Sequence, residues 1–345
     1  MKKFKRSRAL GLFDVELRLS KLSKLGDPLE RLSLGLDFEV FRLYLTEKLS
    51  KLSAGAGGRP PYDYVMMFKI LILQRYYNVS DDQVEYQIND RLSFMRFLGL
   101  TLADDVPDSK TVWAFREQLI ELEAIDGLFL LFLGELSKLN LVVHEGKIID
   151  ASFVEVPKQR NSREENAAIK KGEIPVSISE NPHVESQKDT DARWTKKGGE
   201  SYFGYKNHIK VDSKSKIITG YTVTVASEHD SQELDNLIDS SDNGQELYAD
   251  AAYKGEKQSE QIESKGMTDK VHERAYTNTP LTEAQIASNK VKSKTRARVE
   301  HVFGFMEMSM NGMYLYNIGK KRITAVIGLM NLTYNMFRKI QIMPI

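Results

Sequence analysis

Three acidic residues between positions 150 and 300 are candidates for a metal-binding site. Asp150 closes the apolar stretch KIID and Asp250 closes ELYAD, so each acid is predicted to end a strand. Sheets flanked by helices bind ligands at such strand ends. Glu300 is the third acid, and it follows a basic run in KVKSKTRARVEHVFG, residues 290–304. Carboxylates that meet at one sheet edge repel one another unless divalent cations neutralise them, and oxygen ligands suit Mg²⁺ or Mn²⁺.

Each of these acids also has an ordinary structural interpretation. An aspartate after an apolar strand is usually a cap or a loop residue. Glu300 lies one helical turn after Arg296, and such surface pairs are common and contribute little to stability. Other catalytic signatures fail: the chain has no G-x-S-x-G, Tyr205 stands where GESYFGYK needs the lysine of a phosphate-binding loop, and no histidines have H-x-x-x-H spacing. Carboxylates therefore remain the best candidates.

The basic residues before Glu300 predict contacts with a polyanion. They are Lys290, Lys292, Lys294, Arg296 and Arg298. Lysine and arginine side chains bind the phosphates of nucleic acids. The acid and the bases would then act on one polyanionic substrate. The alternative is a solvated helix face that binds nothing.

The first 140 residues are predicted to be helical throughout. Leucines recur at three- and four-residue spacing between residues 12 and 53, and YDYVMMFKILILQRYY is apolar almost all round, as a buried helix would be. We expect an all-helical N-terminal domain at 1–140 that binds DNA ends. SDDQVEYQINDRLSFMRFLGL could form a helix-turn-helix with Arg91 and Arg96 at the duplex, although simple helical packing is preferred because apolar residues dominate.

From residue 141 the apolar pattern changes to the period of strands. KIIDASFVEV, YKNHIKVDS and KIITGYTVTVA alternate as strands do, and QELYADAAY is a further strand. One long helix is expected from about Thr282 through Glu300, and RITAVIGLMNLTYNMFRKI is another. Strands that cluster and then alternate with helices predict an α/β (α+β) fold with a mixed sheet flanked by helices at 141–345. The charged residues 157–200 are expected to form a mobile insertion at the sheet edge.

Composition restricts the class of protein. A chain of 345 residues is long enough for two domains, and 41% hydrophobic with 28% charged residues is typical of globular proteins. The absence of cysteine excludes disulfides and thiolate zinc sites and fits a reducing cytoplasm. The longest apolar run, Leu128 to Leu133, is far shorter than a bilayer requires. We expect a soluble cytoplasmic protein with no membrane partner.

Several motifs in this order resemble a known family. IIDASF, YADAAYKG and RARVEHVFG carry the three acids with spacings of 100 residues (250 − 150) and 50 residues (300 − 250). They are similar to the DDE transposases of bacterial insertion sequences, in the group known as IS-five within the wider IS-four-like superfamily. YFGYKNHIKVD, HDSQELDNLI, IGLMNLTYNMFR, DPLERL and PDSKTVWAFREQL also resemble that group. The resemblance covers nearly the whole chain.

The resemblance implies a ribonuclease-H-like catalytic domain behind a helical domain, with Asp150, Asp250 and Glu300 as its catalytic and metal-binding triad. Two Mg²⁺ or Mn²⁺ ions are implied, with Asp150 bridging them. Water would first free a 3′-hydroxyl at an element end, and that hydroxyl would then attack target DNA. The partners implied are double-stranded DNA, as terminal inverted repeats and as target, and a second copy of the chain on paired ends. The place implied is the bacterial cytoplasm, at the nucleoid.

Further DNA contacts are expected around this triad. The basic run supplies Lys292, Lys294, Arg296 and Arg298, and Lys254 is a further candidate. Lys206 and His208 lie on the strand expected beside Asp150, where an exposed lysine could instead protect a strand edge. Trp194 could stack on a displaced base or anchor the insertion to the body.

The family's motif around the glutamate is incomplete in this chain. Arg296 fits it, but Ser293 occupies the position of its tyrosine and Glu307 that of its lysine. Two alternatives to an active transposase therefore stay open. One is a DNA-end-binding protein that has lost catalysis, and the other is a metal-dependent nuclease without strand transfer.

Overall fold

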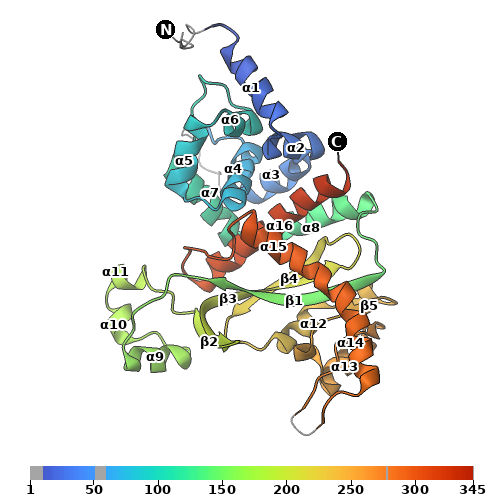
Figure 1. The fold of residues 1–345 in the computed structure, drawn as a ribbon. Coiled ribbons are helices and arrows are strands. Elements are labelled where there is room, and N and C mark those ends of the chain that lie inside the picture. Colours follow the sequence, from blue (N-terminus) through green and yellow to red (C-terminus); the bar gives the residue numbers. More distant parts are fainter. Residues whose placement is uncertain (1–10, 51–59, 277–278, 345) are drawn as a thin grey trace, which may run out of the picture.

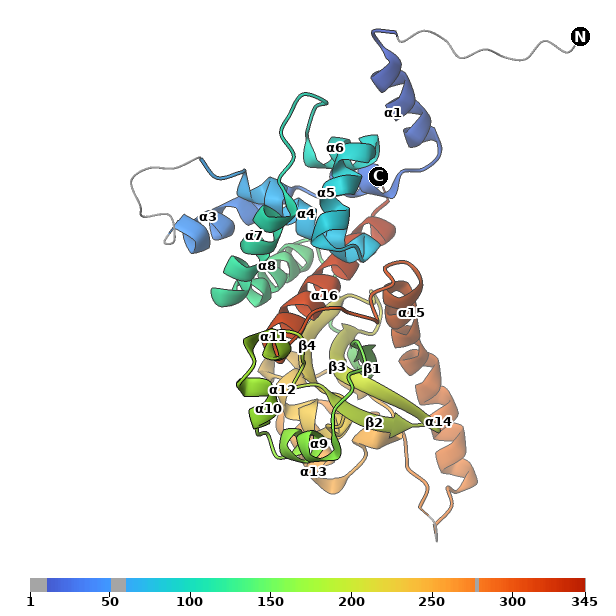
Figure 2. The ribbon, with the colours of Figure 1, turned by 90° about the vertical axis from the view of Figure 1, so that its left-hand side faces the viewer.

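The computed structural model describes residues 11–50, 60–276 and 279–344 (Figures 1 and 2). The first part of the chain is helical, as predicted. Its helices are α1 (Asp14–Lys24), α2 (Pro28–Gly35), α3 (Arg42–Ser50), α4 (Tyr64–Tyr77), α5 (Asp81–Asp90), α6 (Leu92–Leu98), α7 (Ser109–Glu121) and α8 (Ala124–Lys138), with a 3-10 turn at Phe38–Phe41. The start of the chain and the glycine-rich stretch after α3 lie outside the described residues.

The second part contains the strands. They are β1 (Gly146–Glu155), β2 (Arg193–Lys197), β3 (Glu200–Asp212), β4 (Ile218–Val225), β5 (Glu246–Tyr248) and β6 (Thr268–Asp269). The helices between and after them are α9 (Arg163–Lys170), α10 (Val176–Ser179), α11 (Pro182–Glu185), α12 (Leu234–Leu237), α13 (Glu256–Ser264), α14 (Glu283–Arg296), α15 (Glu300–Met308) and α16 (Lys320–Ile342).

The strands form one mixed sheet in the order β2-β3-β1-β5-β6, and β4 pairs with β3. β3 runs antiparallel to β1, β2 and β4, whereas β5 runs parallel to β1 and to β6. β1 therefore lies inside the sheet, between β3 and β5. The predicted fold class, a mixed sheet flanked by helices behind a helical part, is confirmed.

Helix α16 joins the two parts into one core. It contacts α2, α4 and α8 as well as β4, and it runs between the helical part and the sheet in Figures 1 and 2. Polar groups on its buried face fix it to the sheet: the Asn331 side chain exchanges two hydrogen bonds with that of Asn207, and Asn335 bonds both backbone groups of Ile218. The last predicted helix thus packs as much with the N-terminal part as with the sheet.

Two sequence expectations differ from the structure. The long helix predicted through Glu300 is interrupted by a 3-10 turn at Ala297–Val299, so that α15 begins at Glu300. Residues 157–200, predicted as a mobile insertion at the sheet edge, form the edge strand β2 and the helices α9, α10 and α11, which lie beside the sheet in Figure 1. This segment has few large apolar side chains, and a polar anchor holds it: the Tyr205 hydroxyl of β3 donates to the buried Asp189 carboxylate at 2.8 Å.

None of the helices in the described part of the chain combines the length and apolarity needed to cross a bilayer.

Candidate active site

Asp150 lies in the middle of a strand rather than at its end. β1 continues five residues further, to Glu155, and Asp150 pairs with Ile209 of β3. On the other side β5 ends at Tyr248, which pairs with Ile148. Beyond that point β1 has no β5 partner, so Asp150 faces the space beyond the carboxyl end of β5. The prediction that Asp150 closes a strand is wrong, but the predicted neighbouring strand end is present.

Asp250 occupies the position that this register makes equivalent to Asp150. Each acid lies two residues beyond the paired residues Ile148 and Tyr248. The Asp250 side chain caps the 3-10 turn Ala251–Tyr253 and accepts a hydrogen bond from the backbone N–H of Ala252 at 2.8 Å. The cap interpretation of this aspartate is therefore correct, and the cap holds the carboxylate next to β1.

Glu300 reaches the same place from a different segment. The 3-10 turn at Ala297–Val299 separates it from α14, and its side chain is 61% exposed. Arg296, at the end of α14, lies between two of the acids. Its Nη1 donates to Oδ2 of Asp150 at 2.8 Å, and its Nη2 lies 3.5 Å from Oε1 of Glu300. The predicted Arg296–Glu300 pair exists, but the closer partner of Arg296 is Asp150.

The pKa of Asp150 reflects the charged groups that surround it. Burial is the largest influence and raises the pKa of Asp150 to about 6. The Arg296 guanidinium and the backbone N–H of Ala151 lower this pKa, whereas the carboxylates of Asp250 and Glu300 raise it. Asp250 and Glu300 therefore both lie within electrostatic reach of Asp150.

The three carboxylates fit a divalent cation by their chemistry. Oxygen donors suit Mg²⁺ and Mn²⁺, and carboxylates that repel one another gain stability from a neutralising cation. In this conformation the cation that neutralises Asp150 is Arg296. Accordingly, no three His, Asp or Glu side chains in the described residues stand close enough together to hold a metal ion. Metal binding at Asp150 therefore requires that Arg296 release at least one of its oxygens.

Sequence reasoning missed two residues beside this site. His272 lies close to Asp250 and Arg296, since both influence its pKa, which burial lowers. Its Nε2 is 3.3 Å from the Ser293 hydroxyl, which also bonds the Asn289 carbonyl. The Tyr253 hydroxyl is buried without a hydrogen-bond partner in the described structure, and burial, followed by the charges of Asp230, Asp150 and Asp250, raises its pKa. Tyr253 belongs to the motif YADAAYKG, but nothing in that motif marks its hydroxyl as a neighbour of the acids, and His272 lies outside the motifs.

The predicted basic run divides into two groups. The Lys292 ammonium donates to the Val271 carbonyl at 2.8 Å, and Arg298 donates to the Ser213 carbonyl at 2.7 Å. These two side chains hold α14 and the following turn against the body. Lys290 and Lys294, in contrast, are exposed. Of the run, these two lysines are therefore the ones most available to DNA phosphates.

Lys206 and His208 were predicted to contact DNA, and the structure corrects this prediction. β3 is covered on both faces, so His208 is fully buried and Lys206 is 8% exposed. The Lys206 ammonium pairs with Asp230 at 2.7 Å, and His208 Nε2 bonds the Thr224 hydroxyl at 2.8 Å. Both side chains are occupied inside the protein and do not reach the surface.

Lys254 and Trp194 have partial surface access. The Lys254 ammonium lies 3.3 Å from carboxylate oxygens of both Asp269 and Glu273, so it is already paired with two acids. Trp194 of β2 packs on the Phe203 ring, with centroids 5.0 Å apart, yet is 47% exposed. The anchoring role of this tryptophan is visible, and its remaining surface leaves room for a ligand.

The candidate helix-turn-helix is held by packing. α5 and α6 are separated by Arg91 alone, whose guanidinium lies over the rings of Tyr77 and Phe94. Arg96 forms ion pairs with Asp27 and Glu30 at 2.7 and 3.0 Å. Both arginines stabilise the helical part, in agreement with the simple packing interpretation.

Comparison with known proteins identifies both parts of the chain. Residues 143–336, more than half of the chain, match the family described as Transposase DDE domain, and residues 17–118 match Transposase domain (DUF772). Among solved structures, the piggyBac transposase synaptic complex with hairpin DNA aligns with a TM-score of 0.46 and 11% identity, over 93% of this chain and 76% of that chain.

Proposed function

Because this chain belongs to the DDE transposase family, we propose that it cleaves DNA at the ends of its own insertion element and joins them to target DNA, with Asp150, Asp250 and Glu300 as the catalytic acids. The observation that carries this proposal is the meeting of three acids from distant segments at the end of β5. Asp150 is fixed by β1, Asp250 by its capping bond, and Glu300 by the start of α15.

DDE transposases generally use divalent metal ions. We propose that the three carboxylates of this chain hold Mg²⁺ or Mn²⁺, two ions in all. Such ions, when bound, activate the attacking oxygen and stabilise the leaving oxygen of an in-line phosphoryl displacement. The Asp150 side chain is 14% exposed, and it would hold the metal together with Asp250 and Glu300.

The other residues of the site position the DNA. Arg296 can exchange Asp150 for a phosphate oxygen, because a guanidinium binds carboxylate and phosphate with the same geometry. Lys290 and Lys294 project from the exposed face of α14 and are proposed to bind the phosphates that lead the strand into the site. Trp194 is proposed to stack on a base near the scissile bond.

Each of the two proposed steps forms one phosphorus–oxygen bond and breaks another. In the first, the oxygen of water bonds to the phosphorus at the element end, and the bond to the 3′-oxygen breaks, which leaves a 3′-hydroxyl. In the second, that hydroxyl bonds to a phosphorus of target DNA and displaces another 3′-oxygen. Joining two ends requires two active sites, so we propose a homodimer on DNA. Its place of action is proposed to be the bacterial cytoplasm, at the nucleoid.

A cleavage assay on a duplex that carries the terminal repeats flanking the gene tests this function. In Mg²⁺, Asp150→Asn, Asp250→Asn and Glu300→Gln should each abolish nicking and leave end binding nearly unchanged. Glu260→Gln, on the exposed face of α13, is the matched control and should nick normally. Near-normal nicking by any triad variant would remove that residue from the proposed site.

The DNA products of this assay distinguish a transposase from the two alternatives, a nuclease and an end-binding protein. Nicked ends without joined products would identify a nuclease that lacks strand transfer. End binding without nicking, at every Mg²⁺ and Mn²⁺ concentration, would identify an end-binding protein. Ser293 and Glu307, where the family has tyrosine and lysine, make the second outcome the one to test first.

A further inference from the structure

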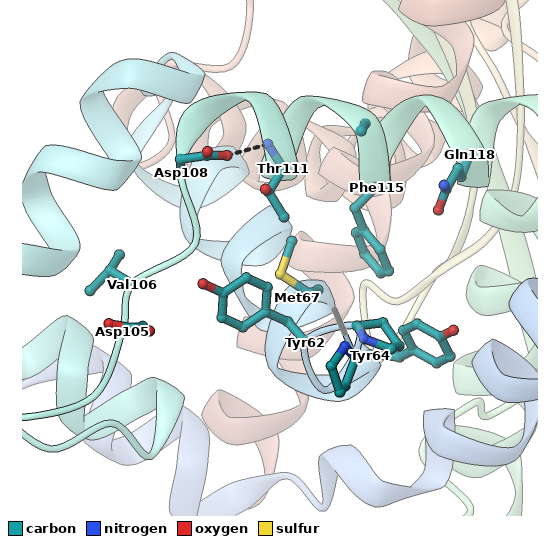
Figure 3. Close-up of a pocket in the computed structure, with 12 residues that line it drawn as sticks. Tyr62, Tyr64, Met67, Asp105, Val106, Asp108, Thr111, Phe115 and Gln118 are labelled. Atoms are coloured by element: carbon teal, nitrogen blue, oxygen red, sulfur yellow. Dashed lines mark hydrogen bonds between the residues drawn. The ribbon is translucent and has the colours of Figure 1, made fainter. Parts of the chain in front are cut away.

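Two of the pockets that border the helical part of the molecule differ in charge. The first lies between residues 60–67 and α7 (Figure 3), and the rings of Tyr62, Tyr64 and Phe115 line it. Asp108 stands on its wall and accepts from the backbone N–H of Thr111 at 2.7 Å, and Lys or Arg do not occur among its lining residues. An anion would be repelled there. The second pocket, of about 670 Å³, has the opposite character.

The second pocket lies where the helical part meets the segment between α15 and α16. The end of α4, the start of α5 and α7 form one wall, and residues 311–317 form the other. Asn78 joins the walls: its backbone is left-handed, with φ 46°, and its side-chain amide donates to the carbonyls of Asn311 and Tyr314 at 2.7 and 3.3 Å. The pocket is therefore built by fixed contacts between distant segments.

Two arginines line this pocket, and only one of them is neutralised. Arg116 is 7% exposed and forms a two-pronged pair with Asp81, at 2.6 and 2.9 Å, so that the single carboxylate of the pocket is matched by a single guanidinium. Arg75 has no hydrogen-bond or ion-pair partner anywhere in residues 11–50, 60–276 and 279–344. Burial is the largest cause that lowers the pKa of Arg75 to about 10; the Arg116 charge lowers it further, and the Asp81 carboxylate opposes the shift. With two guanidiniums and one carboxylate among its lining residues, the pocket carries a net positive charge.

The remaining donors of the pocket also point to an anion. The Nε of Arg116 is buried without a partner. The N-terminus of α5, which carries the positive end of the helix dipole, lies on the same wall, and the N–H groups of Ser80 and Gln83 are already bonded to each other's side chains in a capping box. The Arg75 guanidinium is partly exposed and unpaired within the described residues, so it is the donor that an anion with several oxygens would bind.

We propose that this pocket is a phosphate site in which Arg75 provides the charge, and that the phosphate belongs to the backbone of DNA. The choice of DNA rests on the proposed function and on the position of the pocket. The wall at 313–315 is hydrogen-bonded to the end of β1, since the N–H of Glu155 donates to Met313 and its carbonyl accepts from Leu315, both at 2.9 Å. Asp150 lies five residues back along that strand, roughly 17 Å away.

Phosphates advance about 3.4 Å per base pair along the axis of each strand, so the distance from Glu155 to Asp150 corresponds to roughly five base pairs. One continuous duplex would contact both the pocket, whose wall is bonded to Glu155, and the catalytic acids. The pocket would fix the position of the end relative to the cleavage site, and it would do so through the backbone, independently of sequence.

The test measures DNA binding in EDTA, so that it does not depend on catalysis. Arg75→Gln should weaken binding of a terminal-repeat duplex about tenfold. It should also lower the slope of log K against log salt by about 0.9, the value for one phosphate contact. Arg75→Lys should keep the slope. Arg42→Gln is the matched control, because it removes the same charge from an arginine that Glu39 and Asp63 already neutralise.

A second variant, Asn317→Asp, and a second ligand, inorganic phosphate, distinguish loss of the phosphate site from misfolding of Arg75→Gln. Asn317→Asp places a negative charge at the partly exposed mouth of the pocket and should weaken binding as Arg75→Gln does. In thermal melts, inorganic phosphate should stabilise the wild type and not Arg75→Gln. Stabilisation by phosphate with an unchanged DNA salt slope would overturn DNA as the source of the phosphate. If the wild type and all pocket variants behave equally in DNA binding and in the thermal melts, the phosphate site itself is overturned. Loss of DNA cleavage without a change in these two measurements would concern only the triad.

Discussion

The guanidinium of Arg296 donates to Oδ2 of Asp150 at 2.8 Å, although the two residues are 146 positions apart. The same guanidinium lies 3.5 Å from Glu300. One arginine thus holds two of the three proposed catalytic acids, and it compensates charges that would otherwise repel one another. This arrangement makes Arg296 a competitor for any metal ion that binds Asp150.

Removal of this competitor should strengthen metal binding by the free protein. Arg296→Gln takes away a positive charge in direct contact with Asp150. Such a contact contributes from about 1 to about 4 kcal/mol, depending on the local dielectric, so the affinity for Mn²⁺, followed by electron paramagnetic resonance, should rise about tenfold. Arg298→Gln, two residues away and bonded to the Ser213 carbonyl, is the control. Unchanged Mn²⁺ affinity in Arg296→Gln would show that Arg296 does not compete.

The division of the basic run predicts two different phenotypes. Lys290→Gln with Lys294→Gln should lower the salt slope of DNA binding by about 1.8, or 0.9 for each lost phosphate contact, and should leave the melting temperature unchanged. Lys292→Gln with Arg298→Gln removes bonds to the Val271 and Ser213 carbonyls. This pair should lower the melting temperature and leave the slope nearly unchanged. Equal slopes in the two double variants would mean that net charge alone governs binding.

The candidate acids could be predicted from the sequence because each follows an apolar strand or a basic run, and these are local patterns. The contact between Arg296 and Asp150 could not, because it depends on how α14 crosses the sheet. Lys206 and His208 also show what a local sequence pattern cannot predict. Their alternation on β3 suggested an exposed face, but helices cover both faces of this interior strand, so alternation carries no information about exposure there.

The helix boundary at Glu300 was also beyond local reasoning. Residues Ala297, Arg298 and Val299 contain no glycine or proline, so nothing in their sequence marks the 3-10 turn that separates α14 from α15. The bond from Arg298 to Ser213 and the burial of Val299 identify tertiary packing as the cause. The helical part, in contrast, followed its periodicity closely, since its buried faces are set by spacing along single helices.

The link between α16 and the sheet predicts a large loss of stability from one amide. Asn335 accepts from the N–H of Ile218 at 2.9 Å and donates to its carbonyl at 2.8 Å, and both residues are fully buried. Asn335→Leu leaves two buried backbone groups without partners, at about 1–3 kcal/mol each. Urea unfolding should show a loss of about 2–6 kcal/mol. Asn89→Leu, where the amide is exposed and bonds only within α5, should change stability by less than about 0.5 kcal/mol.

His208 should make the protein less stable as the pH falls. Burial lowers the pKa of His208 to about 4, while the acids Asp230 and Glu233 oppose this shift and Lys206 supports it. An unfolded histidine titrates near pH 6.5. Between about pH 6.5 and 4 the unfolded chain therefore takes up a proton that the folded chain does not, and stability that is fully present above pH 6.5 is lost progressively.

The predicted loss from this residue is about 2 kcal/mol between pH 7 and pH 5. Because other groups titrate in the same range, the measurement is the difference between wild type and His208→Gln in the free energy of unfolding, taken at several pH values. The variant should be less stable at pH 7, where it loses the bond to Thr224, and the difference should shrink by about 2 kcal/mol at pH 5. His183→Gln, on the exposed helix α11, provides the control. A wild-type-to-variant difference that stays constant with pH would mean that His208 can be protonated inside the folded protein, and β3 would then have to admit water or shift its neighbours.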